Sequence, residues 1–191
     1  MAVLWLNPDA APGAPPLQEL TDEALMLRYA ERGDQAAFAA LFQRYAPRLR
    51  GFFLRSVCSA VIADDLTQVT LLNVHRARRD YDPARAFRPW VFTIALNVRR
   101  EHFRRAGRRN EVALEPGEPA APSVSPEVST PHDRLMRRAI GELREDQREV
   151  ILLHWYEGFS FPEIGRMLGA STGAVKLRAH RAYNALRSAL S

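Results

Sequence analysis

Arginine and aromatic residues are interleaved from His75 to Arg109 in a pattern that suits nucleic acid. The stretch holds eleven arginines against three acids. Cationic side chains neutralise phosphates, and aromatic rings offer surfaces on which unpaired bases stack. The interleaved rings belong to Tyr81, Phe87, Trp90, Phe92 and Phe103. Trp90 and Phe103 have the helical spacing of core residues, so the loop 80–87 is the better candidate to receive a flipped base.

Two adjacent carboxylates, Asp64 and Asp65, stand shortly before this stretch. Paired carboxylates can perform acid–base chemistry, yet no nearby histidine, cysteine or further acid completes a catalytic or metal-binding cluster. The five histidines are scattered, and the chain has no glycine-rich phosphate loop. We therefore expect no enzymatic activity, no metal, no cofactor and no small-molecule substrate. Two interpretations of the pair remain: stabilisation of a helix dipole, or docking onto a basic partner surface.

The C-terminal residues have the pattern of a helix-turn-helix. Ser160 and Glu163 have capping-box spacing and predict a short helix that ends at Gly169. Ser171 is suited to cap a last helix, which we expect from Thr172 to about residue 188. Two helices joined by a short glycine-containing turn form a helix-turn-helix. On shape alone, a plain helical hairpin fits equally well.

The charge of this segment favours nucleic acid over the plain hairpin. From residue 160 to the C-terminus, five basic side chains stand against one acid. If Val175, Ala179, Ala182 and Leu186 face inward, a separate set of side chains faces outward: Lys176, Leu177, His180 and Arg181. A recognition helix presents such a face to the major groove of duplex DNA.

The chain divides into two blocks, residues 20–105 and 132–190, in which apolar residues recur every three to four positions. The Ala- and Pro-rich residues 1–19 are expected to form a flexible tail. Residues 106–131 contain five prolines among small and acidic residues, and are expected to form an extended linker. We predict an all-α fold of two small helical domains joined by this flexible proline-rich linker. The C-terminal domain is the helix-turn-helix.

Local signals predict several helix boundaries in these blocks. Thr21 and Asp34 are suited to cap two successive helices, with Gly33 ending the first. A third helix is expected over residues 61–79, and a fourth from Arg88. The second of these helices is expected to bury Phe38, Leu41, Phe42, Tyr45 and Leu49.

The second block opens with another capping-box spacing, at Asp146 and Glu149. The residues that follow predict a helix with an apolar face of Val150, Leu153 and Trp155. This helix would precede the helix-turn-helix.

The bulk composition indicates a soluble protein with an anionic partner. Hydrophobic residues make up 47% of the 191 residues and charged residues 26%, and the net charge is +5. All but one of the basic residues are arginine, which suits phosphates, although GC-rich codon usage explains that bias equally well. Cys58 is the only cysteine, so no internal disulfide can form. No apolar run approaches the roughly 20 residues that span a bilayer, and we expect a cytoplasmic protein.

The motifs of both blocks together resemble those of extracytoplasmic-function (ECF) RNA polymerase sigma factors of the sigma-70 family. The first block contains Asp64-Asp-Leu-x-Gln68, Arg76-x-Arg-Arg-Asp-Tyr-Asp-Pro83 and Phe87-Arg-Pro-Trp-Val-Phe-Thr-Ile-Ala-x-Asn97. The second contains Leu143-Arg-Glu-Asp-Gln-Arg-Glu-Val150, Tyr156-Glu-Gly-Phe-Ser-Phe-Pro-Glu-Ile164 and Gly173-Ala-Val-Lys-Leu-Arg-Ala-His-Arg-Ala182. The resemblance implies sigma region 2 over 20–105 and sigma region 4 over 132–190. It implies an alternative sigma factor that binds core RNA polymerase, recognises promoter DNA and initiates transcription of a specific regulon.

The resemblance also implies roles for particular residues. Core polymerase would be bound by Asp64, Asp65, Leu66, Gln68 and Leu72. The minus-ten promoter element would be opened and held by Arg76, Arg79, Tyr81, Asp82, Arg85, Phe87, Arg99 and Arg100. The minus-thirty-five element would be read by Ser171, Thr172, Lys176, Leu177, His180 and Arg181. A cognate anti-sigma factor, often membrane-bound in this family, is a further implied partner.

Three positions depart from the family's usual pattern. Val69 and Leu71 stand where the family usually has an acid and an aromatic residue. Leu177 stands where a small or polar residue is common, and either contacts a thymine methyl group or packs. The alternative interpretation is a dimeric helix-turn-helix regulator that acts without core polymerase. Such a regulator would bind palindromic duplex DNA by itself, whereas a sigma factor binds promoter DNA poorly alone.

Overall fold

The regular secondary structure of the described residues is helical. The computed structural model describes residues 16–57, 59–112 and 131–190, and these residues contain no strand. The all-α prediction is therefore confirmed. Most of the expected tail (1–19) and most of the expected linker (106–131) lie outside the described residues. None of the described helices is both long enough and apolar enough to cross a membrane.

The first two helices begin and end where their capping residues predict. Helix α1 spans Asp22–Arg32; the Thr21 hydroxyl accepts a hydrogen bond from the Ala24 N–H at 3.2 Å, and Gly33 ends the helix at a φ of 68°. Helix α2 spans Gln35–Val57. The Asp34 carboxylate accepts hydrogen bonds from the N–H groups of Ala36 and Ala37, at 3.0 and 3.1 Å. Of the predicted apolar face of α2, Leu41, Tyr45 and Leu49 are buried and Phe38 is partly buried, whereas Phe42 is 46% exposed.

The next two helices differ from prediction at their ends. Helix α3 spans Ala60–Arg76 and is followed by the 3₁₀ turn η1 at Arg78–Asp80, where a helix to residue 79 was expected. The Arg78 guanidinium donates to the carbonyl of His75 at 2.8 Å, which satisfies an acceptor at the helix end. Helix α4 spans Phe87–Val112 and continues past residue 105, the expected end of the first block.

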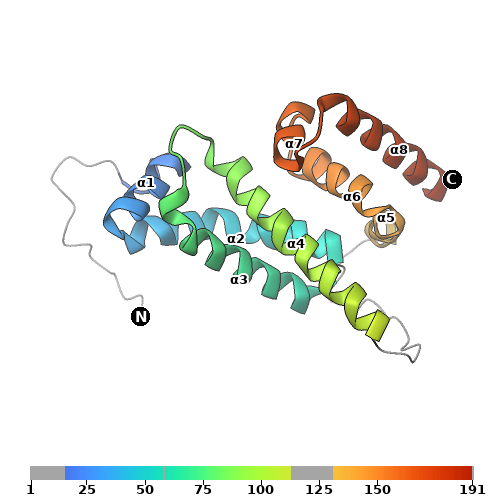
Figure 1. The fold of residues 1–191 in the computed structure, drawn as a ribbon, viewed down its shortest axis with the longest axis horizontal. Helices are drawn as coiled ribbons and strands as arrows, with labels where there is room; N and C mark the ends of the chain where they lie inside the picture. The colour runs from blue at the N-terminus through green and yellow to red at the C-terminus, as the bar shows by residue number, and fades with distance from the viewer. Residues whose placement is uncertain (1–15, 58, 113–130, 191) are drawn as a thin grey trace.

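The second block contains helices α5 (Pro131–Glu142), α6 (Glu145–Ile151), α7 (Phe161–Leu168) and α8 (Thr172–Leu190). A π-helical turn, η2 (Leu152–Tyr156), follows α6, with the Glu157 N–H bonded to the Leu152 carbonyl at 3.2 Å. In Figure 1, α1 to α4 form one bundle, and α5 to α8 lie against it on the side away from α1.

Two local predictions for the second block are wrong. Helix α6 begins at Glu145 after Arg144, which makes no side-chain cap, and Glu149 bonds to arginines of the first block instead of closing a capping box. Trp155 was expected on the apolar face but is 65% exposed. The wider π turn rotates the residues within it away from the spacing of an α-helix, which explains this error.

The helix-turn-helix is confirmed in its boundaries. Ser160 and Glu163 form the predicted capping box, and Gly169 ends α7 at a φ of 64°. The Ser171 hydroxyl accepts from the Ala174 N–H at 3.2 Å and caps α8. Gly165 is required for the close turn, because a Cβ there would lie 2.7 Å from the Ala170 carbonyl oxygen.

A continuous hydrophobic core joins the two blocks. Phe92 of α4 and Phe159, which precedes α7, are 0% and 1% exposed and meet edge to face with centroids 5.4 Å apart. Residues of both blocks belong to one buried cluster. The second block is so small that it can bury little apolar surface on its own. The contact with the first block therefore contributes to the stability of the second.

Candidate nucleic-acid and partner interfaces

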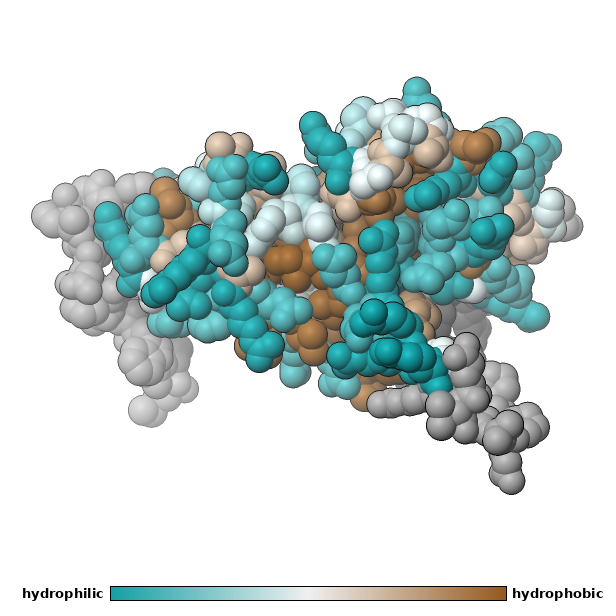
Figure 2. Space-filling model, viewed as in Figure 1, coloured by the Kyte–Doolittle hydropathy of each residue, from teal (hydrophilic) through white to brown (hydrophobic). Residues whose placement is uncertain are grey.

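Helix α3 exposes a stripe of mixed polar and apolar side chains. Asp65 and Gln68 are exposed, and so are the apolar side chains of Val69 (44%) and Leu72 (45%). Figure 2 shows hydrophobic surface among hydrophilic side chains near the middle of the molecule, where α3 and α4 lie in Figure 1. A helix face with exposed carboxylates and exposed apolar side chains suits a protein partner.

Two of the predicted docking residues make contacts within the chain: Asp64 forms an ion pair, and Leu66 is buried in the core. Asp64 accepts from the Arg50 guanidinium at 2.7 Å, with its side chain half exposed. Leu66 is only 7% exposed and packs in the core. The side chain of Leu66 therefore supports α3 from inside, and it does not lie on the exposed stripe with Asp65, Gln68 and Leu72.

Four of the residues predicted to contact the minus-ten element lie on the surface at the end of α3 and in the following loop. Arg76, Arg79, Asp82 and Arg85 are all exposed. Asp82 accepts from the Ala84 N–H at 3.0 Å and lies 3.3 Å from Arg85, which holds the turn in place. The loop thus presents arginines to solvent on a short, hydrogen-bonded turn.

The two aromatic rings of this loop are buried, which corrects the expectation that the loop offers them to a flipped base. Tyr81 is 7% exposed and Phe87 1% exposed. The Tyr81 hydroxyl donates to the Arg85 carbonyl at 2.5 Å, and the Phe87 ring meets Tyr45 edge to face at 5.0 Å. Burial raises the pKa of Tyr81 to about 12. In this structure both rings belong to the core that supports the loop, and neither is free to stack on a base.

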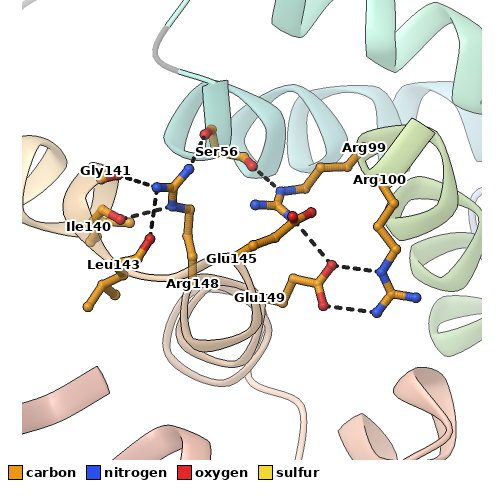
Figure 3. Close-up of polar contacts among 9 residues, drawn as sticks. All are labelled: Ser56, Arg99, Arg100, Ile140, Gly141, Leu143, Glu145, Arg148 and Glu149. Carbon is orange, nitrogen blue, oxygen red and sulfur yellow. Dashed lines mark hydrogen bonds and ion pairs between the residues drawn. The ribbon is translucent and has the colours of Figure 1, made fainter. Parts of the chain in front are cut away.

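Arg99 and Arg100 are held by acids of the second block (Figure 3). Arg100 donates from Nε and Nη2 to the two oxygens of Glu149, each at 2.9 Å. Nη1 of Arg99 lies 3.2 Å from Glu149 and 3.2 Å from Glu145, and its Nε donates to the Ser56 hydroxyl. Arg99 is 0% exposed and the side chain of Glu149 4%.

The pKa values of the two arginines in this cluster shift in opposite directions. Burial lowers the pKa of Arg99, and the nearby carboxylates of Glu149 and Glu145 oppose that effect. The hydrogen bond to Glu149 raises the pKa of Arg100. Both guanidinium groups are charged at neutral pH. Arg99 is thus enclosed at the junction of the two blocks, whereas the Arg100 side chain is 42% exposed and binds Glu149 from the surface.

Helix α8 presents the predicted polar face to solvent. Lys176, His180 and Arg181 are exposed, Leu177 is 49% exposed, and Val175 and Ala182 are buried beneath them. Ser171 is exposed at the N-terminus of the helix, and Thr172 is half-buried. The Arg178 guanidinium lies 3.6 Å from Asp146, which ties α8 to α6. The arrangement leaves the N-terminal half of α8 accessible to a DNA groove.

The second block also contributes acids whose pairing with the first block the sequence patterns did not predict. Glu145 and Glu149 bind the arginines of α4, and Glu157 lies 3.4 Å from Arg48 of α2. Burial raises the pKa of Glu157. The positions of these acids in the sequence give no signal of the pairing, because about fifty or more residues separate the partners. Among residues 16–57, 59–112 and 131–190, no group of three His, Cys, Asp or Glu side chains could hold a metal ion.

Comparisons with known proteins place both blocks in the sigma-70 family. The family described as Sigma-70 region 2 matches residues 41–109, and the family Sigma-70, region 4 matches residues 133–186. The chain is 42% identical over 159 residues to RNA polymerase sigma factor CarQ of Myxococcus xanthus, covering 83% of this chain and 91% of CarQ. It is 32% identical over 171 residues to the ECF RNA polymerase sigma factor RpoE of Cereibacter sphaeroides, covering 88% and 94% of the two chains.

Two solved structures are similar to this chain. The structure of CnrH in complex with the cytosolic domain of CnrY has a TM-score of 0.67 and 31% identity, covering 88% of this chain and 96% of CnrH. The sigma factor RpoE of Bartonella quintana, solved with the anti-sigma factor NepR, has a TM-score of 0.69 and 27% identity, covering 80% and 96%.

Proposed function

Because the chain belongs to the extracytoplasmic-function group of the sigma-70 family, we propose that it binds core RNA polymerase and directs it to a specific set of promoters. The observation that carries this proposal is the presence of both sigma regions in order, at residues 41–109 and 133–186. The dimeric-regulator alternative is not favoured, because it assigns no role to the first of these regions. The protein acts through binding and has no catalytic step of its own.

Core polymerase docks on the exposed stripe of α3. Asp65, Gln68 and Leu72 contact the polymerase, and Asp64 takes part once its Arg50 partner is displaced or shared. Leu66 keeps the helix in position from inside the core. The exposure of acidic and apolar side chains on one helix face supports this assignment. Val69, where the family usually has an acid, makes the stripe more apolar.

The minus-ten element is held by the first region. Arg76, Arg79 and Arg85 neutralise the phosphates of the opened strands, and Asp82 shapes the loop that presents them. Tyr81 and Phe87 brace this loop from the core. Arg99 and Arg100 lie on α4. Arg99 is buried and reaches DNA only when the acids of α6 have moved away, whereas the Arg100 side chain is 42% exposed.

The minus-thirty-five element is read as duplex by α8. Lys176, His180 and Arg181 face the major groove, and Leu177 makes apolar contact there. Ser171 and Thr172, at the N-terminus of the helix, bind a phosphate with the help of free N–H groups. The exposure of the N-terminal half of α8 supports this division of roles.

A cognate anti-sigma factor and a cytoplasmic location complete the proposal. A solved relative from Bartonella quintana is bound to an anti-sigma factor, and we expect a protein of that class to hold this chain inactive. Core polymerase acts in the cytoplasm, so its promoter-recognition subunit has to be present there.

The docking proposal is tested by co-elution of the purified full-length chain with core RNA polymerase. Asp65→Arg reverses a charge on the exposed stripe of α3 and is expected to abolish co-elution. Glu31→Arg reverses an exposed acid on α1 and serves as the matched control, which should co-elute like the wild type. Co-elution of the Asp65→Arg variant at wild-type levels would place the docking surface elsewhere. Failure of the wild type to bind core polymerase would overturn the proposed function itself.

A further inference from the structure

The loop between α3 and α4, residues 77–86, is attached at both ends to helix α1. This minus-ten loop carries two of the arginines that the proposed function assigns to the minus-ten element, Arg79 and Arg85. In Figure 1 the loop lies beside α1. The family described as Sigma-70 region 2 matches residues 41–109, so α1 lies outside the matched residues. The role of α1 therefore has to be inferred from its own contacts.

The C-terminal end of the minus-ten loop is held by Glu23 of α1. The Glu23 carboxylate accepts a hydrogen bond from the Phe87 N–H at 2.8 Å, although the two residues are 64 positions apart. Phe87 is the first residue of α4, and Ala86 before it has no polar side chain that could cap the helix. The N–H groups at a helix start need acceptors from elsewhere, and a carboxylate there also complements the helix dipole. Glu23 thus caps α4 from another helix.

The first turn of α1, which contains Glu23, is itself fixed on α2. Asp22 accepts hydrogen bonds from the Arg44 guanidinium at 2.7 Å and from the Tyr45 hydroxyl. The Arg44 guanidinium also donates to the Leu20 carbonyl at 2.9 Å, just before the helix begins. These bonds set the place of the turn on both sides of its cap. The Glu23 carboxylate is therefore held at the start of α4 by a braced element.

The N-terminal end of the minus-ten loop is held by Tyr29, further along α1. The Tyr29 hydroxyl is hydrogen-bonded to Nδ1 of His75, at the end of α3. The Arg78 guanidinium lies 5.9 Å from the centre of the Tyr29 ring and donates to the His75 carbonyl at 2.8 Å. The ring is 1% exposed and stacks on Phe38 with centroids 4.5 Å apart. Tyr29 thus ties the start of the loop to the core.

We propose that α1 positions the minus-ten loop for DNA, with Glu23 and Tyr29 as its two positioning residues. This inference rests on the proposed function. A loop with both ends tied to one helix has fewer conformations than a loop tied to the chain alone. Its arginines, Arg79 and Arg85, therefore lose less conformational entropy when they bind a DNA strand. Glu23 and Tyr29 do not contact the DNA and act through the loop.

The test uses the holoenzyme, assembled from core polymerase and the full-length chain. Glu23→Ala removes the acceptor for the Phe87 N–H, whereas Glu23→Gln keeps an oxygen that can accept it. Glu31→Ala removes an exposed acid from the same helix and is the matched control.

Three affinities are measured for each protein. The first is for a labelled single strand that carries the minus-ten element of a promoter mapped by run-off transcription. The second is for a duplex that carries the minus-thirty-five element, and the third is for core polymerase. Hydrogen exchange of the Phe87 amide reports the hydrogen bond to Glu23 directly.

Glu23→Ala is expected to lower the affinity for the minus-ten strand by roughly tenfold, the order of one hydrogen bond to a charged group. It should also speed the exchange of the Phe87 amide. Glu23→Gln should restore most of the affinity, and Glu31→Ala should behave like the wild type. The affinities for the minus-thirty-five duplex and for core polymerase should stay unchanged in every variant.

Two results would overturn the proposal. One is a wild-type affinity of Glu23→Ala for the minus-ten strand, and the other is an equal loss of all three affinities, which would show a merely structural role. If Glu23→Ala does not fold, Tyr29→Phe provides the second variant, because it removes the hydroxyl bound to His75 and keeps the ring. A selective loss of minus-ten affinity is expected there too, and its absence would equally overturn the proposal.

The wild-type protein distinguishes this inference from the proposed function. A wild-type holoenzyme that binds neither promoter element would sink the proposed function. A wild-type holoenzyme that binds both, together with a Glu23→Ala holoenzyme that binds both equally well, would sink the positioning role of α1 alone.

Discussion

Arg100 donates two hydrogen bonds, each 2.9 Å long, to the two oxygens of Glu149, although the two residues are 49 positions apart in the chain. The first residue belongs to the region matched by Sigma-70 region 2 and the second to the region matched by Sigma-70, region 4. The bond thus links the two regions through a side chain that family resemblance assigns to DNA. The packing of the two regions therefore affects a residue that is expected to contact DNA.

Substitutions of Leu66 and Leu72 on α3 distinguish a role in stability from a role in binding core polymerase. Leu66→Ala should lower the free energy of unfolding by about 2–5 kcal/mol, because this buried side chain leaves a cavity. Leu72→Ala, at a side chain 45% exposed, should change it by about 0.5 kcal/mol or less and yet weaken binding to core polymerase. Urea denaturation and co-elution measure the two effects. Equal core binding by wild type and Leu72→Ala would remove Leu72 from the docking surface.

Lys176 should contribute to promoter binding through α8. Lys176→Glu is expected to weaken binding of the holoenzyme to its promoter by about 1–3 kcal/mol, and to alter its dependence on salt. Arg138→Glu on α5, a side chain 81% exposed, is the matched charge reversal and should have little effect. Electrophoretic mobility shifts at several salt concentrations provide the measurement. Promoter binding unaffected by Lys176→Glu would show that this side chain does not face the DNA.

Gly165 sets the angle of the helix-turn-helix. Gly165→Ala should destabilise the protein by about 1–3 kcal/mol, because the added methyl group meets the Ala170 carbonyl. Gly141→Ala in α5 adds a methyl group where no packed atom lies within 4 Å. Because alanine has the higher helix propensity, this change should raise the free energy of unfolding by up to about 1 kcal/mol. Thermal unfolding of the two variants compares them directly. A neutral Gly165→Ala would contradict the close approach of the turn.

The capping box at the start of α7 gives a prediction about pH. The Ser160 hydroxyl and N–H donate to Glu163 at 2.6 and 2.8 Å and hold the pKa of that carboxyl below its ordinary value. A carboxyl with a lower pKa in the folded state stabilises the fold above its unfolded pKa. This contribution is lost as the pH falls through the lowered folded value.

Ser160→Ala should therefore raise the pKa of Glu163 towards its ordinary value, and lower the free energy of unfolding at neutral pH by about 0.5–2 kcal/mol. Nuclear magnetic resonance titration of the carboxyl group measures the first effect and urea denaturation the second. Ser188→Ala, at an exposed position near the end of α8, is the control. A Glu163 pKa that does not respond to Ser160→Ala would contradict the hydrogen bond.

The helix boundaries that the sequence predicted well are those set by neighbours along the chain. Thr21, Asp34, Ser160 and Ser171 cap helices as predicted, because a cap needs only the residue and the next few N–H groups. Trp155 escaped prediction because a π turn breaks the regular spacing of the helix.

The site was less predictable where it depends on tertiary contacts. The residues exposed on α3 and α8 follow from helical spacing, so Asp65, Lys176 and Arg181 lie on the surface as expected. The burial of Tyr81 and Phe87 depends on α1, α2 and α4 meeting around the loop, and no local pattern reports this. Glu149 has the spacing of a capping residue, and only the packing of the two regions brings it to Arg99 and Arg100.

Run-off transcription from fragmented genomic DNA tests the sigma-factor account most directly, with core RNA polymerase alone and with the purified protein added. A sigma factor should yield new discrete transcripts whose start sites share two upstream elements, one read by α8 and one opened by the first region. The Asp65→Arg variant should yield none of them. The absence of new transcripts with a wild-type protein that also fails to bind core polymerase would contradict the account.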